Sequence, residues 1–295
     1  MGIFQVSKTG TTVLPSGIEA ELQGLQGKHQ AMITINDEAK RRKGIDQMLK
    51  ESIVRLGNKT EIVLQDVKNL LSADRKALLF ELRQISNNHD RNFIFDYEFP
   101  TKGGQKLKQR YSVDFVKDQF PVTPYHWVAS KMIATYKAEN SIDGKLTDSE
   151  KKEALSADIP VMYEDYSEII EMAKNELVLP ECGVKVYWQM LDGEQETRFA
   201  KLLSVKEAEI TSHEQIKMRR PTYIPEQAKG NEDAKAAVPL DQLSLIDIEA
   251  LRKDIMSKEG DVDSFIVVQY KNDSSIQAQV DLVSTPAFFF ASLAL

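Results

Sequence analysis

Cysteine is almost absent from this sequence, and histidine is scarce. The one cysteine among the 295 residues is Cys182, which excludes an internal disulfide and a zinc site built from several thiolates. The four histidines lack the His-x-x-x-His or His-Glu-x-x-His spacing that brings two imidazoles to one face of a helix. They are His29, His89, His126 and His213. We therefore expect no metal site and no cofactor, and the single thiol fits a reducing compartment.

A basic surplus and a long apolar run are missing as well. Lys and Arg number 38 against 45 Asp and Glu, a net charge of −7, whereas binding to nucleic-acid phosphates needs a basic face. The longest apolar stretch, 287–295, is interrupted by Ser292 and is far shorter than the about 20 residues that span a bilayer. The segment from Met1 to Gly17 lacks the basic and apolar regions of a secretory signal. We expect a soluble protein with no nucleic-acid or membrane partner.

The composition that remains is that of an ordinary globular protein. Hydrophobic residues make up 42% and charged residues 28%, with 14 Gly and 10 Pro, which excludes a collagen-like or largely disordered chain. A chain of 295 residues has the length of one large domain or of two smaller ones.

Hydrophobic periodicity changes along the first part of the chain. Alternation of apolar and polar residues over 18–22 predicts a strand. From 43 to 56 the apolar residues recur at intervals of three and four and predict one helix that ends at Gly57. A second helix is expected over 72–86, with Asp74 in its first turn, where the helix dipole favours a carboxylate.

A hairpin and a mainly helical region follow. Alternating residues at 93–97 and 111–115, on either side of a Gly-containing loop, predict two paired strands. Between 121 and 175 the pattern is helical, and Thr147 with Glu150 has the spacing of a capping box.

The second half of the sequence echoes the first at a constant offset, the one that separates Asp74 from Asp247. The other matched pairs are Leu70 and Leu243, Ala77 and Ala250, Leu78 and Leu251, Asp90 and Asp263, and Tyr97 and Tyr270. The register continues without a gap through a helix, a turn and a strand, which favours a duplication over chance similarity of amphipathic helices. We therefore predict an α+β fold in which two related strand–helix–hairpin modules, 1–115 and 177–295, are joined by a helical insert, 116–176.

No residues have the spacing of a catalytic or phosphate-binding motif, and we predict that the protein is not an enzyme. Cys182 has no neighbouring base in the sequence that would activate it. The basic run at 40–43 is typical of a solvated helix start and, less often, of a surface for an acidic partner. Asp74 and Asp247 suit the first turn of a helix, so we expect an architectural role for both.

The apolar tail is the candidate partner-binding segment. Three adjacent phenylalanines cannot all face one side of a strand or helix, so at least one needs a second surface. Either both surfaces lie within the fold, or the tail binds a partner. The residues of this hypothesis are Phe288, Phe289, Phe290, Leu293 and Leu295.

Several short motifs together resemble a known family. They are Leu-Pro-Ser-Gly at 14–17, Gly-Leu-Gln-Gly-Lys at 24–28, Lys-Arg-Arg-Lys-Gly at 40–44, Leu-Leu-Ser-Ala-Asp-Arg at 70–75 and Leu-Arg-Gln-Ile-Ser at 82–86. Leu-Pro at 179–180, Leu-Asp-Gly at 191–193 and the aromatic ending are similar in the second half. The chain resembles the baseplate hub subunit and tail-assembly proteins of contractile-tailed bacteriophages of the T-even type.

The resemblance implies a structural component of the tail baseplate, at or near the central hub, or alternatively an assembly chaperone that leaves before the virion matures. Its partners would be other baseplate or hub proteins, tail-tube proteins or tape-measure proteins, and its location the virion, after assembly in the host cytoplasm. Many relatives carry paired cysteines after the strand that resemble a small metal ribbon. Here 97–100 and 270–273 contain no cysteine, so the family's metal is not expected.

Overall fold

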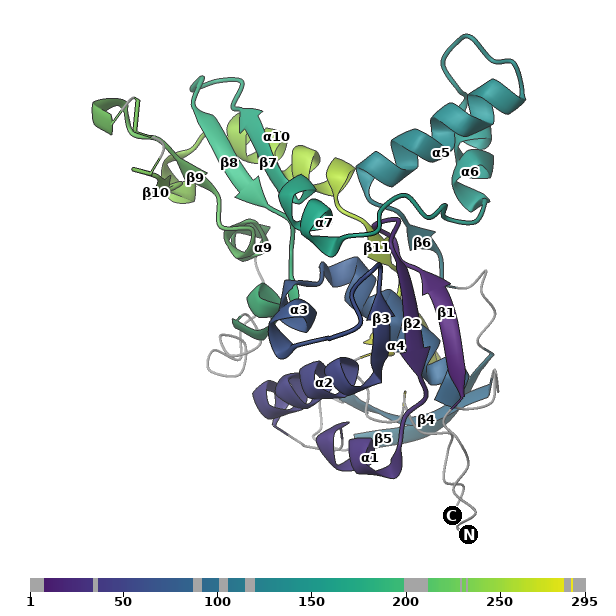
Figure 1. Cartoon of the computed structure of the whole chain (residues 1–295). Helices are drawn as coiled ribbons and strands as arrows, with labels where there is room; N and C mark the ends of the chain where they lie inside the picture. The colour runs from purple at the N-terminus through teal and green to yellow at the C-terminus, as the bar shows by residue number, and fades with distance from the viewer. Residues whose placement is uncertain are drawn as a thin grey trace.

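The fold is α+β, with several small antiparallel sheets and helices around them (Figure 1). A computed structural model describes residues 8–33, 37–86, 92–100, 106–114, 120–198, 212–228, 230–231, 233–283 and 288.

Within the described residues, the first half contains a three-stranded sheet, four helices and a long hairpin. In order, these are β1 (Thr9–Val13), β2 (Glu19–Gln23), α1 (Gly27–Ile33), α2 (Glu38–Ser52), β3 (Ile53–Leu56), α3 (Leu64–Asn69), α4 (Ser72–Ser86), β4 (Asn92–Pro100) and β5 (Lys106–Asp114). The sheet has the order β1-β2-β3 and is antiparallel, and α4 packs against β1 and β2. The expected strand near 18–22, the helix over 72–86 and the hairpin are thereby confirmed.

The expected helix over 43–56 is wrong in its last turn. Helix α2 ends at Ser52, and Ile53 to Leu56 form β3. Ile53 and Val54 are β-branched and favour a strand, and β3 completes the sheet by pairing with β2. A run of apolar residues at intervals of three and four therefore concealed a change from helix to strand.

The middle of the chain is mainly helical and contacts the turn between β1 and β2, residues 14–18, here called the first hairpin turn. Its elements are β6 (Val122–Thr123), α5 (His126–Glu139), α6 (Asp148–Ser156) and α7 (Tyr166–Met172). The Trp127 indole donates a hydrogen bond to the Ser16 carbonyl at 3.0 Å, and the Met162 amide donates to the Gly17 carbonyl at 2.7 Å. Thr147 and Glu150 form the expected capping box.

The second half begins with another antiparallel sheet, in the order β10-β9-β8-β7. Its elements are β7 (Lys174–Val178), β8 (Lys185–Gln189), a helical stretch over 193–198, α9 (Ser212–Met218), β9 (Thr222–Tyr223), η2 (Glu226–Ala228), β10 (Ala236–Ala237), η3 (Leu240–Gln242), α10 (Leu245–Lys258), β11 (Asp261–Val262), β12 (Phe265–Tyr270) and β13 (Asp273–Asp281). Strand β11 pairs with β6 of the middle region.

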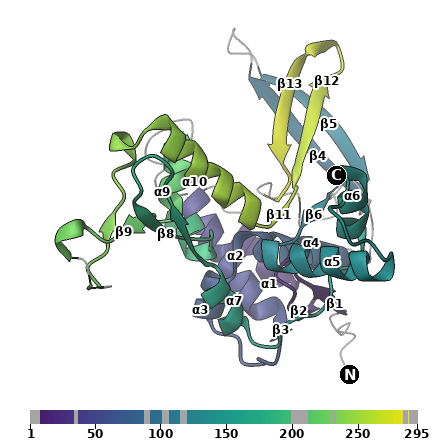
Figure 2. The same cartoon turned by 90° about the horizontal axis from the view of Figure 1, so that it is seen from above.

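The two long hairpins, β4–β5 and β12–β13, project side by side (Figure 2). The Gln109 side chain joins them, because its amide donates to the Gln269 carbonyl at 3.4 Å and its oxygen accepts from the Lys271 amide at 2.8 Å. The rings of Phe99 and Tyr270 meet edge to face with centroids 5.8 Å apart. The hairpins, each from one half of the chain, thus hold each other by side-chain contacts.

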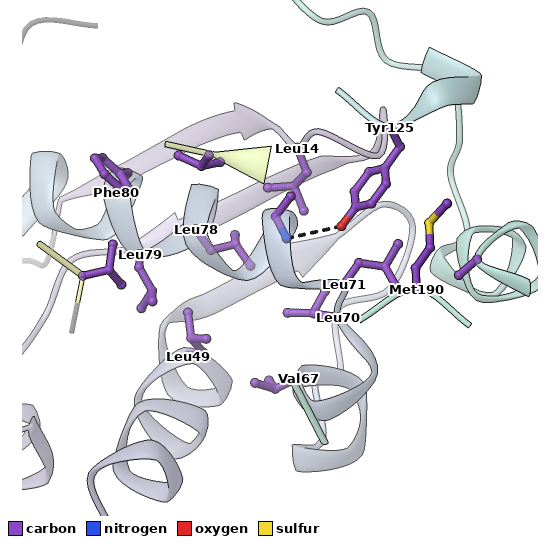
Figure 3. Close-up of a cluster of buried hydrophobic side chains, with 14 of the residues drawn as sticks. Leu14, Leu49, Val67, Leu70, Leu71, Leu78, Leu79, Phe80, Tyr125 and Met190 are labelled. Atoms are coloured by element: carbon purple, nitrogen blue, oxygen red, sulfur yellow. Dashed lines mark hydrogen bonds between the residues drawn. The ribbon is translucent and has the colours of Figure 1, made fainter. Parts of the chain in front are cut away.

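A common hydrophobic core connects both halves. Leu14, Leu70, Leu78 and Met190 are fully buried, and Figure 3 shows Met190, from the second half, beside Leu70 and Leu71. At about 25 cal/mol for each Å² of apolar surface removed from water, this shared burial favours folding of the halves together. Among the described residues, no helix is both long and apolar enough to cross a membrane.

Gly57 allows the middle region to approach the sheet, and we expect Gly57→Ala to destabilise the protein. Its φ is +57°, and an added Cβ would lie 2.0 Å from the Glu164 carbonyl oxygen. Gly183 is a matched control, because its φ is +68° and a Cβ would meet nothing within 4 Å. The left-handed backbone costs either alanine about 1–2 kcal/mol, and the clash adds about 1–3 kcal/mol to Gly57→Ala. Urea denaturation measures both, and equal losses would contradict a tight contact at Gly57.

Candidate functional site

The start of α4 gathers polar side chains from distant parts of the chain. The Asp74 carboxylate is fully buried and accepts a hydrogen bond from the Ser16 amide, at 3.0 Å, and one from the Tyr166 hydroxyl, at 2.6 Å. The Tyr166 oxygen in turn accepts from the Leu71 amide at 2.8 Å. Asp74 therefore joins the first hairpin turn to α7, a contact that its place in a helix dipole did not predict.

A second tyrosine completes the first turn of α4. The Ala73 amide donates to the Tyr125 hydroxyl at 3.2 Å, the bond drawn in Figure 3. The first amides of a helix have no partner within the helix, so Tyr125 and Tyr166 satisfy two that would otherwise be buried without one. Burial raises the pKa of both tyrosines well above the usual value, and both are neutral hydroxyls at physiological pH.

Burial also raises the pKa of Asp74, from 3.8 to about 6, although its hydrogen bonds from Tyr166 and Ser16 oppose the shift. A shift of that size corresponds to roughly 3 kcal/mol of folding free energy at neutral pH. Burial of the ionised Asp74 carboxylate therefore lowers the free energy of unfolding, and the hydrogen bonds from Ser16 and Tyr166 offset only part of that loss.

Asp247, the counterpart of Asp74 in the sequence echo, makes a similar contact in the second half. Its carboxylate accepts from the Glu181 amide at 2.8 Å and from the Cys182 amide at 3.2 Å. Burial would raise the pKa of Asp247, but these bonds and one to Ser244 hold it below the usual value. The expected architectural role is confirmed for both aspartates, since each fastens a hairpin turn to the start of a helix.

The neighbouring Arg75 connects four elements through its buried guanidinium. It donates to Asp46 of α2 at 2.5 Å and to the Val67 carbonyl of α3 at 2.8 Å. Its Nε lies 3.3 Å from Glu196, in the helical stretch over 193–198. Gly193 leaves room for this, because a Cβ there would lie 2.5 Å from the guanidinium. The sequence indicates that Arg75 could pair with neighbouring carboxylates, but it does not identify Asp46 and Glu196, which come from distant elements, as those partners.

Among the residues of the partner-binding hypothesis, Phe288 lies in the core. It is fully buried, its ring meets Phe80 edge to face at 5.2 Å, and its carbonyl accepts a hydrogen bond from Arg83. Phe288 is therefore covered by its own chain and is not an exposed anchor. The other four residues, Phe289, Phe290, Leu293 and Leu295, lie outside the described residues.

Other residues considered from the sequence are not brought together. Cys182 is exposed in the turn between β7 and β8. His29 is buried and pairs with Glu51, while His126 lies near the Lys258 carbonyl and His213 near Asp241. In the part of the chain that the structure describes, no three His, Cys, Asp or Glu side chains are grouped as metal ligands.

Comparison with protein-family models, with curated proteins and with solved structures finds no match to this chain.

The opposite pKa shifts of the two aspartates predict opposite pH dependences of stability. Because folded Asp74 binds its proton more tightly than the unfolded chain does, the free energy of unfolding of the wild type, relative to Asp74→Asn, should rise by about 2–3 kcal/mol as the pH falls from 7 to 4. The pKa of Asp247 in the wild type is lowered instead. The free energy of unfolding of the wild type, relative to Asp247→Asn, should therefore fall as the pH falls through the usual carboxylate range. Denaturant titrations from pH 4 to 7.5 measure both differences, and a wild-type curve parallel to that of Asp74→Asn would contradict the buried ionisation.

The position of Phe288 predicts a large loss when its side chain is truncated. Phe288→Ala removes a fully buried ring and should lower the free energy of unfolding by about 3–5 kcal/mol. Phe265, of which 44% is exposed, is the matched control and should lose less than about 1 kcal/mol as alanine. A loss at Phe288 as small as that at Phe265 would place this ring outside the core.

Proposed function

We propose that this chain is a structural component of a bacteriophage contractile-tail baseplate, at or near the central hub, and that it acts by binding neighbouring proteins rather than by catalysis. The observation that carries the proposal is the meeting of the family-like motifs in space. The 14–17 turn is bonded to the 70–75 motif through Ser16 and Asp74. The Ser72 amide donates to the Leu191 carbonyl at 2.8 Å, and the Gly193 amide donates to the Leu70 carbonyl at 3.1 Å.

Each motif is short and apolar and would by itself be weak evidence for the resemblance. The contacts among the motifs in the fold support it. Motifs from 14–17, 70–75 and 191–193 form one junction, so they behave as parts of a single architectural unit. Chance matches spread along 295 residues would have no reason to share hydrogen bonds.

We also propose that the two halves are related modules, with the helical insert between them. Each begins with an antiparallel pair, β1–β2 or β7–β8, whose turn contains Leu-Pro and a Gly of positive φ, 84° at Gly17 and 68° at Gly183. A third strand, β3 or β9, then pairs with the second. In each, the aspartate at the helix start receives amides of that turn. A duplication accounts for these similarities most simply.

The partners would be other baseplate or hub proteins, tail-tube proteins or tape-measure proteins. The hairpins β4–β5 and β12–β13 suit such contacts, because each is a two-stranded sheet within the described residues and strand edges readily pair with other chains. The protein would be located in the virion, after assembly in the host cytoplasm.

Quantitative mass spectrometry of purified particles of the phage that encodes this chain tests the proposal. A structural component should be present at a fixed ratio to the tail-tube protein in every preparation. Absence from mature particles would contradict that role. Recovery of the chain with tail proteins only from infected-cell lysates would favour the assembly chaperone instead.

A further inference from the structure

Helix α10 presents a row of exposed side chains with the spacing of a coiled-coil seam. Leu245 is 83% exposed and Met256 is 69% exposed, and Glu249 and Arg252 are exposed between them. The successive intervals of four, three and four along this row match the a and d positions of a heptad repeat. Ile246, 61% exposed, borders the row. Leu245 and Ile246 are adjacent, and contiguous exposed apolar residues mark interaction surfaces more often than single ones do.

The corresponding face of α4 is covered by the chain itself. At the constant offset between the two halves, the row corresponds to Ser72, Lys76, Leu79 and Arg83. Lys76 pairs with Asp261 at 2.7 Å, and Leu79 and Arg83 are buried. On α10, by contrast, all four residues of the row are exposed.

The order of charges along the row identifies its occupant. If a second α10 packs antiparallel, Leu245 of one copy faces Met256 of the other, and Glu249 faces Arg252, because both pairs are centred on the same point of the helix, between Ala250 and Leu251. A twofold axis beside that point therefore gives apolar contacts at both ends and two Glu–Arg pairs in the centre. In a parallel pair, each glutamate would face a glutamate, which is unfavourable.

We propose that two copies of this chain associate through an antiparallel pairing of their α10 helices. The contact is isologous, so the same surface serves both copies and closes the assembly at two. This inference goes beyond the baseplate proposal and does not depend on it, since its tests use the purified chain alone.

Charge exchange tests the pairing. By analytical ultracentrifugation, the wild type should form dimers at about 10–100 µM, and Glu249→Arg should weaken dimerisation at least about tenfold because Arg then faces Arg. The double variant Glu249→Arg with Arg252→Glu should restore dimerisation, a rescue that a different partner surface would not give. Lys151→Glu, on exposed α6, is the control and should dimerise like the wild type.

Leu245→Glu should give a folded monomer, since an acidic residue in the first helical turn is favourable for the helix itself, and circular dichroism checks its folding. A wild type that remains monomeric up to about 200 µM, or a charge exchange that fails to rescue, would overturn the proposal.

Disulfide trapping tests the antiparallel direction. In a Cys182→Ser background, Leu245→Cys and Met256→Cys should each cross-link poorly alone and efficiently when mixed, because residue 245 of one copy lies beside residue 256 of the other. Cross-linking of Leu245→Cys with itself would indicate a parallel pair and overturn the proposal.

Discussion

The first turn of α4 carries the constraint on which the rest of the structure depends. Asp74 and Arg75 are adjacent, oppositely charged and buried, and they are bonded to different parts of the chain. Asp74 holds the first hairpin turn and α7, while Arg75 holds α2, α3 and the stretch that contains Glu196. Apolar side chains can shift slightly against one another at little cost, but a buried charge that loses its partner costs several kcal/mol of folding free energy. These two residues therefore fix how the two halves and the middle region are placed relative to one another.

The middle region is consequently part of the architecture rather than an addition to it. Tyr125 and Tyr166, at the beginnings of α5 and α7, supply the hydroxyls for the Ala73 and Leu71 amides. An aromatic ring with a polar tip suits this task, because the ring adds to the core while the oxygen reaches the helix start. Without these two hydroxyls, α4 would begin with buried amides that lack partners, at about 1–3 kcal/mol for each.

Local patterns in the sequence predicted the local structure well and the junction poorly. The bounds of α4 and the capping box at Thr147 depend on periodicity and on contacts within a helical turn, so the sequence shows them directly. The last turn expected of α2 was wrong because β3 owes its form to pairing with β2, a strand from much earlier in the chain. The bond between Ser16 and Asp74 joins still more distant segments, and no periodicity carries such a distance. Phe288 likewise took a core position that an apolar tail alone could not distinguish from a surface one.

Helices α4 and α10 show how one arrangement acquires different properties from its surroundings. Asp74 is enclosed by tyrosines of the middle region, and its pKa rises to about 6. Asp247 accepts from two backbone amides instead, and these bonds, with one to the Ser244 side chain, lower its pKa. The contrast extends along the helices: Lys76 of α4 pairs with Asp261 and Leu79 and Arg83 are buried, whereas Leu245 and Met256 of α10 are exposed. In the proposed antiparallel pair, the order Leu, Glu, Arg and Met along α10 lets each apolar residue meet an apolar one, and each Glu meet an Arg, of the second copy.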